Sequence, residues 1–304
     1  MNPGSVTESN SAIATVISAV LVLGLIVTAT TMLHVYYIPA WKSDSECAHL
    51  TDVQVEMSDL KSRIDILSAL LAVDPESTAY MSMPIELGGG DIPIIGTIKS
   101  SGMLAVNVND CGIVVVSSNK THHTVYNSGT DLTHLGAIHY HSRNNYYIDQ
   151  MFECENGALI IVQDNRSLMK LSPAITITKN AATDNISVAV NAIKLIGEKR
   201  TISSTVVEEV MLTSNTSSEL FSSGNDLFNV STVDITMYTN YPDAWETYFN
   251  TTAENADLGY GSSNDYTITS DVTSVTLSVS GRAGEDDISL HVNRITIDAS
   301  VGNL

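Results

Sequence analysis

AIATVISAVLVLGLIVTATTMLHVYYI, residues 12–38, decides the architecture of this chain. The run holds no Lys, Arg, Asp or Glu, and His34 is its single ionisable residue. At a rise of about 1.5 Å per residue it forms a helix of roughly 40 Å, which exceeds the bilayer hydrocarbon core of about 30 Å. The run therefore predicts a transmembrane helix. It is too long for a secretory signal, and no small-residue cleavage pattern ends it.

Small side chains are scattered along this helix, at Ala14, Ser18, Gly24 and Ala29. Small residues let neighbouring helices approach closely in a membrane or a bundle. Ordinary transmembrane composition explains them equally well. The sequence thus leaves two interpretations open, a helix-assembly surface and simple exposure to lipid.

Pro39 marks the end of the apolar run. Proline has no amide hydrogen and its ring clashes with the preceding turn, so we expect the helix to kink or pause between Tyr37 and Trp41. Tyr36, Tyr37 and Trp41 cluster there, as an aromatic belt at a membrane surface does.

A second helical pattern covers residues 48–72 and ends at Asp74-Pro75, because the residue before proline is pushed out of helical geometry. We expect Glu56 and Lys61 to form ion pairs across its apolar seam. A heptad seam packs on another helix, in a coiled coil, or on the chain's own β domain, and three heptads do not distinguish the two. The seam consists of Leu50, Val53, Met57, Leu60, Ile64, Leu67 and Leu71.

The rest of the chain changes to short runs of alternating apolar and polar residues, as in Ile175-Thr176-Ile177-Thr178. This alternation is typical of strands with one buried face. One helix is predicted to begin at Pro242, with three aromatic residues on one face: Trp245, Tyr248 and Phe249.

The predicted fold class is therefore α+β. Residues 1–75 form an N-terminal helical rod, and residues 76–304 form one continuous, mainly antiparallel, sandwich-like β head.

The charge of the chain excludes nucleic acid as a partner. The formal net charge is −20, with only 14 Lys and Arg among 304 residues. Binding a polyanion requires clustered basic residues that release counterions.

Three cysteines, Cys47, Cys111 and Cys154, are too few and too irregularly spaced for a zinc motif. In an extracellular head, Cys111 and Cys154 are the plausible disulfide pair, and an unbridged pair is an equal alternative. Cys47 would then be a free or intermolecular thiol.

Three other patterns carry weak chemical signals. Ser117 and Lys120 have a Ser-x-x-Lys spacing but follow a strand, so a penicillin-recognising site is rejected. Asp257, Asn264 and Asp265 could bind calcium but lack EF-hand spacing. A polar loop hairpin is favoured over a metal site for the five clustered histidines, His122, His123, His134, His139 and His141. We therefore expect no enzyme activity, metal or cofactor.

Six Asn-x-Ser/Thr acceptors permit N-glycosylation of an exported head, but chance alone gives about five in so Ser- and Thr-rich a chain. The acceptors are Asn119, Asn165, Asn185, Asn215, Asn229 and Asn250.

The segment SAIATVISAVLVL, residues 11–23, resembles the N-terminal core of archaeal type IV pilin-like proteins. Pro39 with the heptad helix, residues 96–99 (GTIK) and residues 155–161 (ENGALII) resemble a family of archaeal membrane-anchored surface proteins. The resemblance implies location and assembly, not catalysis. In pilins an early acidic residue neutralises a neighbour's N-terminus, and Glu8 is the candidate here.

Two functions follow as expectations. The first is a structural subunit of an extracellular archaeal pilus-like filament, stored in the membrane and then self-assembled through its apolar helix with β heads outside. The alternative is a non-polymerising, single-pass surface protein that acts as an adhesin or receptor. In both, the head lies outside the cell and glycans are possible partners.

Overall fold

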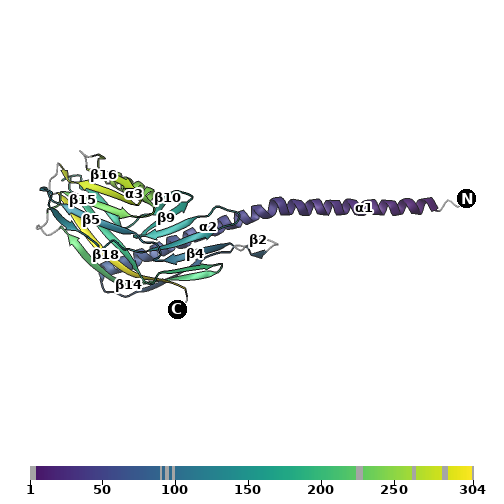
Figure 1. Cartoon of the computed structure of the whole chain (residues 1–304), viewed down its shortest axis with the longest axis horizontal. Helices are drawn as coiled ribbons and strands as arrows, with labels where there is room; N and C mark the ends of the chain where they lie inside the picture. The colour runs from purple at the N-terminus through teal and green to yellow at the C-terminus, as the bar shows by residue number, and fades with distance from the viewer. Residues whose placement is uncertain are drawn as a thin grey trace.

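The computed structural model describes residues 5–89, 91–92, 96–97, 100–223, 229–261, 265–282 and 287–302. A long helical rod projects from one end of a β-rich head (Figure 1). The predicted α+β class, with an apolar N-terminal helix and a mainly antiparallel β head, is confirmed.

The rod follows one continuous helical path through α1 (Ser5–Met32), a π-helical turn η1 (Leu33–Tyr37) and α2 (Ile38–Val73). The interruption expected between Tyr37 and Trp41 lies one turn earlier, in η1. There the Ile38 N–H bonds to the Leu33 carbonyl, five residues back. This wider turn accommodates the proline ring without ending the helix. The helix ends at Val73, directly before Asp74-Pro75, as predicted.

In the described part of the head there are three main sheets, and β2 (Asp91–Ile92) pairs with β3 (Gly96–Thr97) in a separate hairpin. What we call the long sheet has the order β1 (Tyr80–Glu86), β14 (Val207–Ser222), β18 (Ile288–Val301), β12 (Ile186–Ile196), β11 (Ile175–Lys179). The six-stranded sheet has the order β10 (Arg166–Leu171), β9 (Ala158–Gln163), β8 (Met151–Glu155), β7 (Ala137–Arg143), β4 (Ser101–Val106), β13 (Arg200–Ser204). The distal sheet has the order β16 (Tyr266–Asp271), β17 (Ser274–Ser280), β15 (Thr232–Tyr238), β5 (Gly112–Ser118), β6 (Thr124–Asn127). Strand pairing within these sheets is antiparallel, except that β12 and β18 run parallel.

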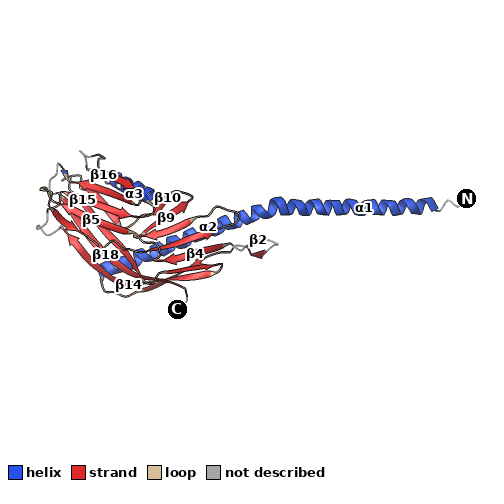
Figure 2. Cartoon of the chain, viewed as in Figure 1, coloured by secondary structure: helices blue, strands red, loops and turns tan. Residues whose placement is uncertain are grey.

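The α2 helix packs between the long sheet and the six-stranded sheet (Figure 2). This answers the question that the heptad pattern left open. The seam packs on the chain's own head, so the coiled coil and the helix-assembly role predicted for its residues are corrected. All seven seam residues are buried with at most 3% exposure: Leu50, Val53, Met57, Leu60, Ile64, Leu67 and Leu71.

The ion pairs expected across the seam are also corrected. Lys61 Nζ pairs with Asp65 Oδ2 of the same helix at 2.5 Å. The Glu56 carboxylate instead accepts the backbone N–H of Glu86, at the end of β1. Both side chains serve contacts within one chain.

A second core lies between the long sheet and the distal sheet, and α3 (Pro242–Asn255) packs against it. Trp245, Tyr248 and Phe249 are buried on one face of α3, as predicted. The long sheet connects the two cores by burying opposite faces at its two ends. In β18 the second core takes Ile288, Leu290 and Val292, and the α2 core takes Ile295, Ile297, Ala299 and Val301.

Replacing Leu60 with alanine is expected to lower the free energy of unfolding by about 2–5 kcal/mol, because it leaves a cavity between two sheets. The matched control is Val55→Ala on the exposed face of the same helix, with an expected change within about 0.5 kcal/mol. Urea denaturation of the full chain in detergent measures both. Equal effects of the two substitutions would contradict the placement of the seam in the head core.

Candidate functional site: the projecting helix and its junction with the head

The α1 helix presents an apolar surface that no described part of the chain covers. Every described side chain from Ala14 to Met32 is exposed, and the helix is long and apolar enough to cross a membrane. Apart from the backbone of its own helix and its chain neighbours, no described atom lies within 4 Å of where a Cβ on Gly24 would be. Exposed apolar surfaces of this size mark contact with lipid or protein. The small residues Ala14, Ser18 and Ala29 lie on this surface, and the side chain of Glu8 lies outside the described part.

Four hydroxyl side chains of α1 are hydrogen-bonded within the helix. A hydroxyl that bonds its own helix backbone leaves no unpaired polar group when the helix enters lipid or a helix bundle. Four hydroxyls each donate to the carbonyl four residues earlier, at 2.8–2.9 Å: Ser18, Thr28, Thr30 and Thr31. The outer surface of α1 is therefore apolar in effect as well as in composition.

Aromatic residues surround the junction between the rod and the head. Tyr36 and Tyr37 are exposed and Trp41 is half-buried, with the Tyr37 and Trp41 ring centroids 6.0 Å apart. The Lys42 ammonium lies 4.5 Å from the centre of the Tyr146 ring and donates to the Tyr146 hydroxyl at 3.0 Å. Tyr146 belongs to the β7–β8 loop, so this loop touches the rod directly beside the aromatic belt.

Glu46 fixes that loop to the rod. Its carboxylate is fully buried and accepts three consecutive backbone N–H groups, from Asn145 at 3.0 Å and from Tyr146 and Tyr147 at 2.7 Å each. Charge-assisted bonds of this kind are about twice as strong as neutral ones. The sequence analysis missed this residue, because an acidic residue on a helix is ordinarily solvated.

All three cysteines are free thiols, so the predicted disulfide is corrected. Cys154 faces the α2 core from β8, whereas Cys111 belongs to the core under α3. The six-stranded sheet therefore separates the two sulfurs. Burial raises the pKa of both thiols, which keeps them protonated and weakly nucleophilic.

Two buried carboxyl groups, Glu153 and Glu155, lie on the face of β8 opposite Cys154. Glu155 accepts from Thr239 Oγ1 and Trp245 Nε1, both at 2.6 Å. Glu153 accepts from Asn109 Nδ2 and from the Tyr241 hydroxyl, within 3.2–3.3 Å. Burial, with the charge of Glu155 as the second cause, raises the pKa of Glu153 to about 8, and burial raises the pKa of Glu155 to about 7. A period-two strand pattern predicts exposure for such residues, and the cover by Asn109 and by the segment from Thr239 to Trp245 reverses it.

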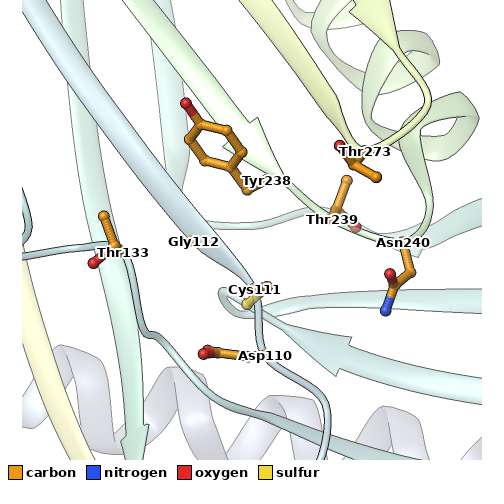
Figure 3. A pocket seen from close by; sticks show the side chains of 8 residues that line it. All are labelled: Asp110, Cys111, Gly112, Thr133, Tyr238, Thr239, Asn240 and Thr273. Atoms are coloured by element: carbon orange, nitrogen blue, oxygen red, sulfur yellow. The ribbon is translucent and has the colours of Figure 1, made fainter.

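A polar cavity of about 230 Å³ lies beside this pair, between the start of β5 and the end of β15 (Figure 3). Asp110, which lines it, is hydrogen-bonded to His134 through Oδ2 and Nδ1. The Cys111 thiol points to the Gly136 carbonyl at 3.4 Å rather than to a base. The Thr239 hydroxyl donates to Glu155 at 2.6 Å, and no other nucleophile is paired with a base among the lining residues. They are Asp110, Cys111, Gly112, Thr133, Tyr238, Thr239, Asn240 and Thr273.

The other predicted chemical patterns are dispersed. His139 is buried in β7, and among the described residues no group of three or more His, Cys, Asp and Glu is arranged to hold a metal. Asp265 bonds Lys179 at 2.8 Å, and Asn264 of the calcium pattern lies outside the described residues. Ser117 is buried in β5, and Lys120 lies in the turn after that strand.

The glycan acceptors differ in accessibility. Asn250 lies in α3 and is bonded to both Glu254 and Tyr266, and the Asn119 amide oxygen accepts three bonds within its own turn. Four acceptors are exposed: Asn165, Asn185, Asn215 and Asn229. Glycosylation stays a prediction, with these four as the favoured positions.

The buried carboxyl pair predicts a pH-dependent stability. Since the folded pKa of Glu153 is about 8 against an ordinary value of 4.5, the folded chain holds a proton that the unfolded chain releases between these limits. The free energy of unfolding therefore falls as the pH rises through this window. In Glu153→Gln the loss between pH 5 and pH 8.5 should shrink by at least about 1.4 kcal/mol, the equivalent of one pKa unit.

Denaturation midpoints and slopes at the two pH values measure this difference, with Glu246→Gln on the exposed face of α3 as the control. Burial lowers the pKa of His49 and His139, which changes stability in the opposite direction below about pH 6.5. Both histidines are present in every variant, so their contribution cancels. An unchanged pH dependence in Glu153→Gln would rule out the proton on that carboxyl.

One family model matches a stretch of sequence that includes both the apolar run of the rod and most of the head. A family model described as a family of unknown function, DUF7289, matches residues 12–297, from the start of the apolar run into β18. Among curated proteins and among solved structures, none matches. The family match covers most of the chain, and the protein therefore belongs to the DUF7289 family.

Proposed function

We propose that the protein is a structural subunit of an extracellular, archaeal pilus-like filament, held in the membrane before assembly. The observation that carries the proposal is α1, an exposed apolar helix of membrane-spanning length that continues without a break into the core helix of the head. Neighbouring α1 helices would form the centre of the filament, and the heads would decorate its outside. The resemblance of residues 11–23 to pilin-like N-terminal segments supports the same assembly.

The two parts of the rod differ in their contacts, because α2 is buried in the head and α1 is exposed. This difference supports assembly through α1 alone. The seam of α2 is used within the chain, so it offers no apolar surface to a second copy. Among the described residues, the longest run of exposed apolar side chains is that of α1, and its burial between subunits would contribute about 25 cal/mol per Å² before ordering costs.

A continuous rod also suits a load-bearing polymer. The helix passes from Ala14 to Val73 without a flexible connection, and the head packs on its second half. A force on the head would therefore be passed to α1 through helix backbone bonds and a packed core, not through a loop.

The second candidate is a single-pass surface protein, an adhesin or receptor, that uses α1 only as an anchor. The observation that favours it is the internal hydrogen bonding of the α1 hydroxyls, because such a helix is stable in lipid without partners. Electron microscopy of purified surface material separates the candidates. Helical filaments containing this chain support the first, and recovery only as a detergent-solubilised monomer supports the second.

Gly24→Ile tests close packing of α1 helices. The free chain has room for the larger side chain, so folding and membrane insertion should be unchanged. Filament yield should fall at least about tenfold, because a loss of about 1.4 kcal/mol per contact already has that effect. The control is Val22→Ile, which adds one methylene at an exposed position of the same helix. Normal filaments from Gly24→Ile would count against a close-packed centre.

A further inference from the structure

The β7–β8 loop, residues 144–150, displays apolar side chains that the described part of the head does not bury. Tyr146, Tyr147 and Ile148 are 45%, 36% and 46% exposed. Three exposed apolar residues in a row form a contiguous patch, which is more informative than a single exposed apolar side chain. Here the backbone holds them outward.

The loop is rigidly built. Besides the three N–H bonds to Glu46, the Asn144 backbone N–H donates to Asp149 Oδ1 at 2.7 Å, and the Asn144 amide donates to the Ile148 carbonyl at 2.9 Å. Burying a carboxylate costs free energy unless it is well hydrogen-bonded. The three N–H bonds to Glu46 are therefore a strong interaction, and they hold this loop in place. The loop is therefore a preorganised surface.

The position of the loop along the rod determines which layer of a membrane the loop contacts. Tyr146 touches Lys42, which directly follows Trp41 of the aromatic belt. Lys42 lies five residues past Tyr37, a rise of about 7.5 Å, and the headgroup layer on each side of a bilayer is about 5–7 Å thick. If α1 spans the hydrocarbon with Tyr36 and Tyr37 at its edge, the contact between Lys42 and Tyr146 lies at the outer boundary of the lipid headgroups.

The chemistry of the loop fits that layer. Tyrosine combines an apolar ring with a polar tip and is enriched at membrane interfaces, and lysine there extends its ammonium towards phosphate. Lys42 directly follows Trp41 of the belt and contacts Tyr146, and Tyr147 and Ile148 follow Tyr146 in the loop; these four residues make up one surface patch beside the rod. We propose that this surface, which we call the lipid seat, binds the headgroup layer of the bilayer and fixes the orientation of the head above it. The inference rests on the membrane-anchored state in the proposed function.

Tryptophan fluorescence in lipid nanodiscs tests the seat. Ile148→Trp adds a reporter to the loop, and Val272→Trp adds one to the exposed β16–β17 turn, elsewhere on the head. The signal of native Trp41 and Trp245, measured in the parent protein, is subtracted. The added fluorescence of Ile148→Trp should be shifted to the blue and quenched at least about twofold by lipids brominated near the headgroup, as expected at the interface. That of Val272→Trp should be unaffected.

Glu46→Gln in the Ile148→Trp background should reduce the quenching, since the amide no longer holds three N–H groups with a charged acceptor. Flotation with liposomes separates the two levels of the argument. Failure to float would overturn the membrane anchor and the seat together. Flotation without quenching of Ile148→Trp would overturn the seat and leave the anchor standing, and crosslinks between loops of two copies in that case would assign the loop to subunit contact instead.

Discussion

Burial of the α2 seam between two sheets is the interaction on which the rest of this molecule depends. Seven apolar side chains contribute about 1.5–3 kcal/mol each on transfer from water, an upper range because the unfolded chain is already partly collapsed. Without α2, the inner faces of the long sheet and the six-stranded sheet would be exposed to water. The helix is thus the centre of the head, and its N-terminal extension has to leave the head at a defined place and in a defined direction.

The long sheet turns this local packing into a larger head. Its central strands bury one face against α2 and the opposite face, further along, against the distal sheet and α3. In β18 the change occurs between Val292 and Ile295, where the alternation of buried residues shifts by one position. One sheet therefore supports two cores, and the second core covers the carboxyl pair of Glu153 and Glu155.

The junction connects packing to function. A rod that is buried along α2 and exposed along α1 changes its environment within a few residues, around η1, Pro39 and Trp41. At that point the Glu46 carboxylate holds the β7–β8 loop against the rod, and the loop exposes tyrosine side chains beside the aromatic belt. The helix, the belt and the loop together form an end of the head suited to an apolar neighbour, whether lipid or the core of a filament.

Much of this architecture could be predicted from local pattern. The apolar run of residues 12–38 and the seam from Leu50 to Leu71 determine two helical segments, because their periodicity depends only on neighbours along the chain. The strand alternation at Ile175-Thr176-Ile177-Thr178 and the helix start at Pro242 are local for the same reason. The packing partner of the seam could not be predicted from local pattern, because an apolar stripe has the same spacing whether it packs on a helix or on a sheet. Only the tertiary structure shows that the seam packs inside the head.

The buried groups at the junction and in the head could be predicted even less from the sequence, because they depend on tertiary contacts. The sequence does not show whether Cys111 and Cys154 lie close together. In the folded chain the six-stranded sheet lies between them and keeps their sulfurs apart. Glu46, Glu153 and Glu155 resemble solvated acids until the Asn145–Tyr147 backbone and the Trp245 side of α3 cover them. The sequence by itself determined the rod and the strand-rich head, whereas burial of charge and the choice of packing partner belong to the folded chain, because both depend on residues about one hundred positions away.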